Sequence, residues 1–191
     1  MAFTKTFNGS TEDGYGTTSG VNKTATTMLV GAGSSSQQDL DTKEFHSFMF
    51  FDTSSLPDNC VVITVKLNWR VTSFAGSDRA ITNKVYIGSN TIGSTLEAAD
   101  YGDTITNGVL LGSMTLNTAG AKTLSSSSSV ITGEVNLTGY TNIEMDAYWN
   151  SSIGPSSCMI TIATQDNGTS AYRPTLEVTY EIPQIISVNI I

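Results

Sequence analysis

Residues 60–72 read Cys60-Val-Val-Ile-Thr-Val-Lys-Leu-Asn-Trp-Arg-Val-Thr72, and from Ile63 onward apolar and polar side chains alternate without a break. Successive side chains of a β-strand point to opposite faces, so the stretch predicts a strand with one apolar and one wet face. Such a strand is typical of an antiparallel sheet that packs on a core with one side only. The residues expected in the core are Ile63, Val65, Leu67, Trp69 and Val71, with Lys66 and Arg70 toward solvent.

The same signature recurs along the chain and indicates the fold class. Short β-prone runs are separated by turn-forming pairs such as Asn8-Gly9, and no long segment has helical periodicity. Many short strands without helices predict an all-β protein, a single-domain jelly-roll β-sandwich of two antiparallel sheets. The expected strands are Phe3–Phe7, Thr27–Val30, Phe45–Phe51, Val61–Thr72, Lys84–Ile87, Leu110–Leu116, Val130–Leu137, Ile143–Asn150, Cys158–Thr164 and Thr175–Glu181.

Three segments carry a more specific expectation. Phe45–Phe51 has apolar residues on both faces, as in a central strand that is covered on both sides. Ser94–Asp100 could hold one or two helical turns, with Ser94 as N-cap and Glu97 three residues later as a capping box. We interpret the low-complexity run Ser125–Ser129 as a loop or strand edge.

No composition shift marks a domain boundary before Pro183. Residues 1–182 therefore predict one jelly-roll β-sandwich, long enough to bury about 70% of the surface of the unfolded chain. Residues 183–191 form a separate β-prone segment. It predicts either an edge strand of the same sandwich or an arm that pairs with a neighbouring subunit. The apolar positions that would serve such an assembly are Ile186, Val188 and Ile190.

Charge and hydropathy limit the partners. The chain has nine basic and 17 acidic residues and a net charge of −8, so it would repel a phosphate-rich partner, and we expect no nucleic acid. No apolar run approaches the ~20 residues that span a bilayer, so we expect no membrane partner. The start Met1–Phe7 lacks the apolar core of a secretory signal. Either a signal was removed or the protein is finished in the cytoplasm where it is made, and the Met1-Ala2 start favours the second expectation.

Catalytic chemistry has few candidates in this sequence. A hydrolase needs a base beside a nucleophile, or two facing carboxylates. His46 is the only histidine and stands among phenylalanines, so we interpret it as structural. The acidic residues within strands fall on the polar faces rather than in an aromatic cleft: Glu144, Asp146, Glu177 and Glu181. We therefore predict that the protein is not an enzyme and has no catalytic residues.

The two cysteines and the metal-binding residue types leave several readings open. Cys60 and Cys158 each open an apolar strand, either as buried free thiols or joined by a disulfide between strand ends. One histidine and no Cys-x-x-Cys motif exclude a zinc site. We expect no cofactor, although a structural calcium could be held by acidic loops, which could equally be solvated. The best clusters for calcium are Glu12 with Asp13, and Asp39 with Asp41.

Sugar binding needs exposed aromatic platforms beside polar groups. Trp69 and Trp149 fall on the apolar faces of their strands, which indicates core positions. The aromatic residues that could serve as platforms are Tyr15, Tyr101, Tyr140 and Tyr148.

Three segments together carry a resemblance to a known family. They are Thr11-Glu-Asp-Gly-Tyr15, Phe48-Met-Phe-Phe-Asp-Thr-Ser-Ser-Leu-Pro-Asp-Asn-Cys-Val-Val-Ile-Thr-Val-Lys-Leu67 and Tyr172-Arg-Pro-Thr-Leu-Glu-Val-Thr-Tyr180. In order and spacing the chain resembles DNRLRE-type domains, a group of carbohydrate-binding-module-like jelly rolls, over roughly residues 5–181. The family motifs concern strands and turns, so the resemblance implies a fold rather than an activity. The name-giving DNRLRE sequence is absent here.

The function class follows by exclusion. Low charge, β-prone ends and the lack of a catalytic signature favour a non-catalytic structural protein of a particle surface, a capsid decoration or tail-associated protein of a phage virion. Its partners would be further copies of itself, as a homo-oligomer, or other coat proteins. The alternative is an extracellular carbohydrate-binding or adhesion module with a polysaccharide as partner.

Overall fold

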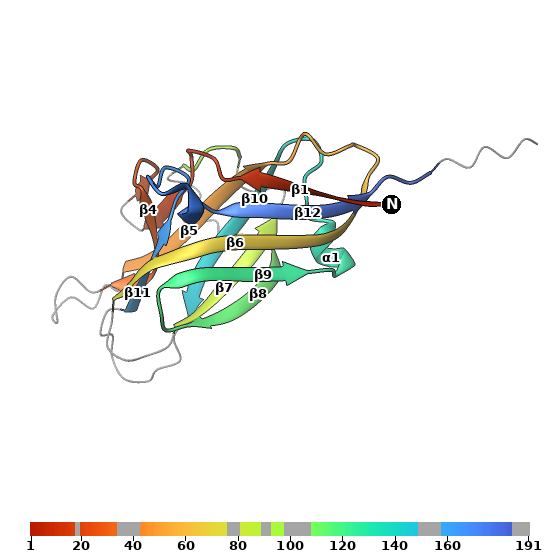
Figure 1. Cartoon of the computed structure of the whole chain (residues 1–191). Helices are drawn as coiled ribbons and strands as arrows, with labels where there is room; N and C mark the ends of the chain where they lie inside the picture. Colours follow the sequence, from red (N-terminus) through yellow and green to blue (C-terminus); the bar gives the residue numbers. More distant parts are fainter. Residues whose placement is uncertain are drawn as a thin grey trace, which may run out of the picture.

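The computed structural model describes residues 1–17, 20–33, 43–75, 81–88, 93–97, 108–148 and 158–184. Nearly all regular structure in these ranges is β (Figure 1). The strands are β1 (Ala2–Asn8), β2 (Gly14–Thr17), β3 (Gly20–Asn22), β4 (Thr27–Gly33), β5 (Lys43–Asp52), β6 (Val61–Ala75), β7 (Ile81–Gly88), β8 (Val109–Leu116), β9 (Gly120–Ser126), β10 (Tyr140–Tyr148), β11 (Cys158–Ala163) and β12 (Thr175–Glu181). The helical elements of the described ranges are α1 (Ser129–Thr132) and the 3-10 turn η2 (Ser170–Tyr172).

The strands form one curled antiparallel sheet, a half-barrel (Figure 1). Its order is β1-β12-β6-β11-β4-β5-β10-β7-β8, with β9 paired to β6 and the β2–β3 hairpin attached to β5. The all-β, antiparallel class predicted from the sequence is therefore confirmed. We call β1, β12, β6, β9, β11 and β4 the first half of the sheet, and the remaining strands the second half.

The concave side of the curled sheet holds the main core, and β6 follows the predicted register. Val65, Leu67, Trp69 and Val71 are buried, whereas Ile63 is only half-buried. Lys66 and Arg70 turn to the outer face and are half-buried there. The alternation ensures that any site on the outer face of β6 is built from the polar residues between these apolar ones.

Strand β5 is covered on both faces, as its sequence predicts. Met49 and Phe51 belong to the main core, and Phe48 and Phe50 form a second cluster on the other face with Leu96. Because this outer face is covered, the polar face of the neighbouring β10 is not solvated. Glu144 is buried and bonds to His46, with 2.8 Å between Oε1 and Nδ1. The expectation that Glu144 lies on a wet face is therefore wrong.

Three other expectations differ from the structure. The strand expected at Val130–Leu137 is instead α1 followed by a turn; α1 buries Ile131 and Thr132, and Val135 is buried in the turn after it. Strand β9 was not expected, since its half-buried positions, Gly120, Lys122, Leu124 and Ser126, include only one large apolar side chain, that of Leu124. Residues 93–97 contain no helical turn, so the capping box of Ser94 and Glu97 does not form within them, and residues 98–100 lie outside the described ranges.

Candidate functional site

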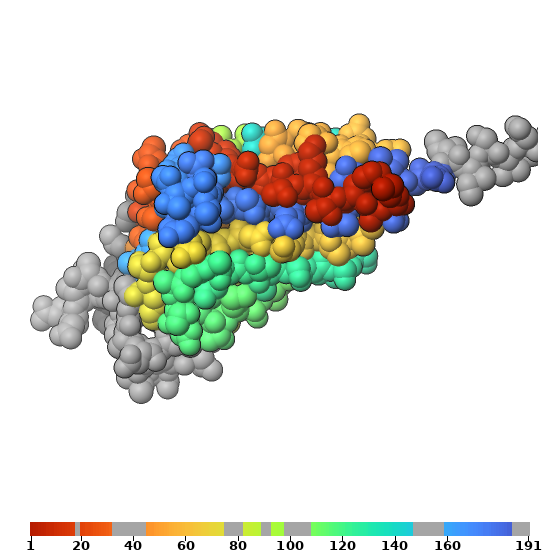
Figure 2. Space-filling view, viewed as in Figure 1, coloured from red at the N-terminus to blue at the C-terminus, as the bar shows by residue number. Residues whose placement is uncertain are grey.

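A shallow pocket opens on the outer face of the first half of the sheet, the face seen in Figure 2, where β12, β6 and β9 run side by side. Its volume is about 280 Å³. Asn68 and Arg70 reach it from β6 because they alternate with buried core residues. We call it the Arg70 pocket; its lining is Asn68, Trp69, Arg70, Ala121, Lys122, Thr123, Ser170, Ala171, Tyr172, Arg173, Thr175 and Glu177.

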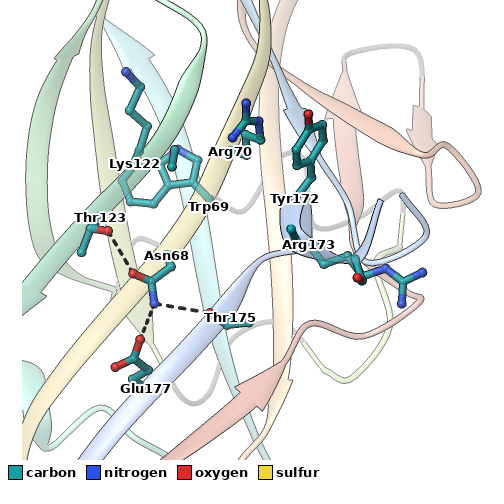
Figure 3. A pocket seen from close by; sticks show the side chains of 12 residues that line it. Asn68, Trp69, Arg70, Lys122, Thr123, Tyr172, Arg173, Thr175 and Glu177 are labelled. Carbon is teal, nitrogen blue, oxygen red and sulfur yellow. Dashed lines mark hydrogen bonds between the residues drawn. The ribbon is translucent and has the colours of Figure 1, made fainter. Parts of the chain in front are cut away.

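Arg70 and Tyr172 form one side of the pocket (Figure 3). The Arg70 guanidinium lies over the Tyr172 ring, with Cζ 4.0 Å from the ring centroid. A contact of this kind contributes roughly 0.5–2 kcal/mol, more as it loses water. Stacking engages the face of the guanidinium and leaves its in-plane N–H groups directed sideways, available as hydrogen-bond donors. Tyr172 therefore positions Arg70 for a ligand that offers oxygen acceptors.

The turn η2 holds Tyr172 in place. The Tyr172 N–H donates to Thr169 O at 2.9 Å, and the Arg173 N–H donates to Ser170 O at 3.2 Å. Arg173 Nε donates to Asn167 O at 2.9 Å, which draws the side chain away from the pocket (Figure 3). Pro174 follows and leads into β12, where a residue without an N–H removes no ladder bond. The turn is thus fixed at both ends by backbone contacts.

A network of polar side chains forms the floor (Figure 3). Asn68 Nδ2 donates to Glu177 Oε1 at 2.7 Å and to Thr175 Oγ1 at 3.3 Å, while Asn68 Oδ1 accepts from Thr123 Oγ1 at 2.9 Å. Lys66 Nζ lies 2.9 Å from Glu177 Oε1. The hydrogen bond from Lys66 holds the pKa of Glu177 below its usual value, and the bond from Asn68 adds to this. Both polar atoms of the Asn68 amide are occupied, so Asn68 orders the floor.

The charge around the pocket differs from that of the chain as a whole. The chain carries −8, yet the Arg70 guanidinium is directed toward this pocket, while the side chain of Arg173 is drawn away from it and Lys122 pairs with Trp69 on the inner side of the sheet. The one acidic lining residue, Glu177, is already paired with Lys66. The pocket therefore suits a polar ligand rich in oxygen acceptors rather than a cation.

The tyrosines predicted as sugar platforms are not gathered at the Arg70 pocket. Tyr15 packs against the main core and lies 5.9 Å from the Phe45 ring, centroid to centroid. Tyr140 packs against the second cluster on the outer face of the second half. Tyr101 and the side chain of Tyr148 lie outside the described residues. Tyr15 and Tyr140 thus contact different clusters and share no site.

The acidic residues predicted for calcium have partners of their own. Glu12 Oε2 lies 3.4 Å from Lys23 Nζ. Asp13 is buried, and its Oδ1 accepts the Phe50 N–H at 2.9 Å. Its Oδ2 has no well-aligned partner in the described part of the chain, although the N–H groups of Ser10 and Gln165 also favour the ionised carboxylate. Burial outweighs them and raises the pKa of Asp13 to about 8.

The donors around Asp13 bear on the calcium prediction. Backbone N–H groups carry partial positive charge and suit a carboxylate that ties chain segments together better than one that binds a cation. The second cluster, Asp39 and Asp41, lies outside the described ranges. Within those ranges no three His, Cys, Asp or Glu side chains are close enough to share a metal ion. Calcium binding stays a prediction.

Of the acidic residues that the sequence placed on polar strand faces, Glu177 in β12 lines the pocket. The other candidates are not among the lining residues: His46 and Glu144 bond to each other in the second half of the sheet, and Glu181 lies at the end of β12. Cys60 is a buried free thiol, and burial raises its pKa. The side chain of Cys158 lies outside the described residues, as do Trp149, Ile186, Val188 and Ile190. In the described ranges no helix has the length and apolar character of a membrane span.

Sequence reasoning did not single out the residues that form this site. Arg70 and Asn68 were expected only to face solvent, and Tyr172 and Arg173 entered only as part of a family-like strand motif. The available signal was the tyrosine three residues before a strand, since a bulky aromatic in a polar turn has to pack on something. Models of known protein families give no match to this sequence, and a search of curated proteins finds no significant similarity.

Proposed function

We propose that this protein is a non-catalytic binding protein with a jelly-roll-type β-sandwich that holds a saccharide in the Arg70 pocket. The observation that carries the proposal is the Arg70 guanidinium, stacked on Tyr172 beside an ordered floor of amide and hydroxyl groups. Saccharides present many hydroxyl oxygens in fixed directions. Preorganised donors and acceptors at a shallow site match that chemistry, because little side-chain freedom is lost on binding.

The groups that remain available divide into donors and acceptors. Arg70 supplies N–H donors, and the Tyr172 hydroxyl can donate or accept. Glu177 keeps acceptor capacity beside its bonds to Lys66 and Asn68, because a carboxylate has about four lone-pair sites. A sugar ring in the pocket would contact the rim of Tyr172 and hydrogen-bond across to Arg70.

The non-catalytic part of the proposal rests on how the carboxylates are distributed. Glycoside hydrolysis needs two carboxyl groups facing each other across the bond, roughly 5–10 Å apart. Glu177 is held in its ionised form by Lys66, which suits an acceptor and not a general acid. Glu144 lies in β10 and bonds to His46 in β5. Strand β10 is not a neighbour of β12, so Glu144 does not face Glu177. These contacts favour recognition without turnover.

The test is a glycan array with neutral and uronic-acid saccharides, followed by calorimetry on each glycan that binds. Arg70→Ala should weaken binding at least about tenfold, as expected for a central arginine anchor. Lys23→Ala makes the same change in net charge, but its ammonium pairs with Glu12 away from the pocket, so it should bind like the wild type. Equal affinity of Arg70→Ala and wild type, or an array without a binder, would refute the proposal.

We propose a second candidate function, that of a structural protein on a particle surface, a capsid decoration or tail-associated protein of a phage virion. Large apolar side chains exposed at one end of β1 favour it, since such patches mark contact surfaces. The genomic neighbourhood separates the two candidates. Capsid and portal genes beside this gene would support the coat protein, and glycoside hydrolase genes would support an extracellular saccharide-binding module.

A further inference from the structure

Strand β1 forms an open edge of the curled sheet. In the described part of the chain its ladder partner is β12 alone, with Ala2 opposite Glu181 and Asn8 opposite Thr175. Every second residue of an edge strand turns its N–H and C=O away from the sheet, where they can pair with another strand. Lysine often guards such edges, but Lys5 Nζ bonds to Ser55 O at 2.9 Å and lies over Phe7. Its charge is therefore not directed across the edge.

Exposed apolar side chains gather where β1 begins. The pairing register places Ala2, Glu181 and Val61 in one row across β1, β12 and β6. Phe3, next to this row, is 40% exposed, and Ile182, just past β12, is 42% exposed. Val61 belongs to the row and therefore points to the opposite face of the sheet from Phe3; it is 56% exposed. The Phe3 ring stacks on Tyr180 with 5.7 Å between centroids. This end offers an apolar surface that nothing in the described part of the chain covers.

The two faces of the edge differ in polarity. Phe3 and Phe7 lie on the inner side of β1, with Phe7 buried in the main core. Thr4 and Thr6 lie on the outer side, where Thr4 Oγ1 bonds to Thr179 Oγ1 at 3.1 Å. A strand that extends this edge should place apolar residues beside Phe3 and hydroxyl or amide residues beside Thr4, because the faces alternate along a strand.

The chain itself contains a segment with that pattern. After Gln184 the sequence reads Ile185-Ile-Ser-Val-Asn-Ile-Ile191, in which Ile186, Val188 and Ile190 alternate with Ser187 and Asn189. The apolar set matches the side of Phe3, and the polar set matches the threonine side. These residues lie outside the described ranges, so the match is one of sequence pattern to the described edge.

The chain between β12 and residue 185 is barely long enough for residues 185–191 to pair with β1 of the same molecule. An added strand beyond β1 lies two strand spacings from β12, about 9.6 Å to the side. Ile182–Gln184 span about 10–11 Å when fully extended, so the crossing would leave no slack. In Figure 1 these three residues instead continue outward, past the start of β1. The edge within easy reach is that of another molecule.

We infer that residues 185–191 of one copy bind as an added strand along β1 of a second copy. Backbone hydrogen bonds to the open edge hold the strand, and Ile186, Val188 and Ile190 cover the exposed side of Phe3. The inference is independent of saccharide binding, and its test measures molar mass rather than glycan affinity.

The experiment measures the molar mass of the full chain by sedimentation equilibrium over a concentration series, in parallel with its thermal unfolding. The full chain should self-associate, and deletion of residues 185–191 should leave a monomer with unchanged melting. The triple variant Ile186→Ser, Val188→Ser, Ile190→Ser should weaken association at least about tenfold. The matched control Ser187→Thr, Asn189→Gln changes the other face and should associate like the wild type.

The receiving side is tested separately with Phe3→Asp, which places a charge on the apolar surface without touching the segment. It should weaken association while leaving the glycan affinity of the Arg70 pocket unchanged. A full chain that is monomeric at all concentrations would overturn the inference. So would a deletion that lowers the melting temperature without changing the mass, because the segment would then belong to its own sheet.

Discussion

Replacing Asp13 by asparagine should change how stability depends on pH. Burial raises the pKa of Asp13 from 3.8 to about 8, so the folded protein holds a proton there that the unfolded chain releases in mildly acidic solution. When folding raises the pKa of a group, that group adds to the free energy of unfolding. The contribution is complete at a pH below the pKa of the unfolded chain, and it is lost as the pH rises through the pKa of the folded protein. We expect this contribution to decline between about pH 4 and pH 8. An asparagine side chain cannot titrate, so the Asp13→Asn variant lacks this decline.

The magnitude follows from the two pKa values. Each pH unit between them removes about 1.4 kcal/mol, so the wild type should lose up to about 4 kcal/mol relative to Asp13→Asn between pH 4 and pH 7. The substitution also has a cost that does not depend on pH, since the new amide faces the Gln165 N–H that favours a carboxylate. Comparing the two proteins at several pH values cancels this constant, because only the change in their difference is used.

The assay is urea unfolding of both proteins at intervals from pH 4 to pH 8, with the free energy of unfolding extrapolated to water at each pH. The difference, wild type minus variant, should fall steadily as pH rises. Parallel curves would show that Asp13 has the same pKa in the folded and unfolded chain. A difference that rises with pH would show that the N–H groups of Phe50, Ser10 and Gln165 outweigh burial and keep the carboxylate ionised.

Three further predictions use the same unfolding assay or a thiol probe. Trp69→Ala should lower the free energy of unfolding by ~3–5 kcal/mol, because Trp69 is buried in the core. Trp69→Phe should lower it clearly less, because the buried Nε1 has no hydrogen-bond partner in the described chain, and equal losses would contradict this. The Cys60 thiol should react with a disulfide reagent only at the rate of unfolding, since it is buried with a raised pKa; rapid labelling of a native Cys158→Ser variant would contradict this. Lys66→Met should lower the free energy of unfolding by less than about 1 kcal/mol at neutral pH, because Lys66 and Glu177 are partly exposed. This loss should vanish as acid protonates Glu177, and a loss that persists in acid would point to lost packing.

The strands of the core could be predicted because burial imposes a period on the sequence. Strand β12 occupies the predicted span Thr175–Glu181, and β6 buries Val65, Leu67, Trp69 and Val71 as its alternation requires. Phe45–Phe51 was correctly interpreted as covered on both sides, because Phe48 and Phe50 are apolar on the face away from the main core. Where one face of a strand is buried in the core, the alternation of apolar residues correctly predicts that strand.

The elements that the sequence did not predict depend on contacts with other parts of the chain. Strand β9 is held by ladder bonds to β6 more than by burial, so Gly120–Ser126 carries little apolar alternation. The run Val130–Leu137 is rich in β-prone residues, but its start forms a helical turn that contacts β6 and β8 and buries Ile131 and Thr132. Glu144 was expected to be solvated, because its own strand does not reveal what packs above it.

The candidate site was the least predictable part. It combines residues from β6, β9, β12 and η2, and their proximity depends on how the sheet pairs rather than on spacing along the chain. The predicted tyrosines were chosen by residue type alone, and Tyr15 and Tyr140 turned out to pack on clusters of their own. The contact of Arg70 with Tyr172 joins a strand to the turn η2, which no spacing along the sequence indicates.

The most direct test of the central claim maps the bound saccharide on the protein by amide chemical-shift perturbation. The glycan is titrated into ¹⁵N-labelled full chain, and the perturbed amides are placed on the sheet. We expect saturable shifts at Asn68–Arg70, Ala121–Thr123 and Ser170–Arg173, which line the Arg70 pocket. Shifts confined to the second half of the sheet, around Tyr140 or the β2–β3 hairpin, would contradict it.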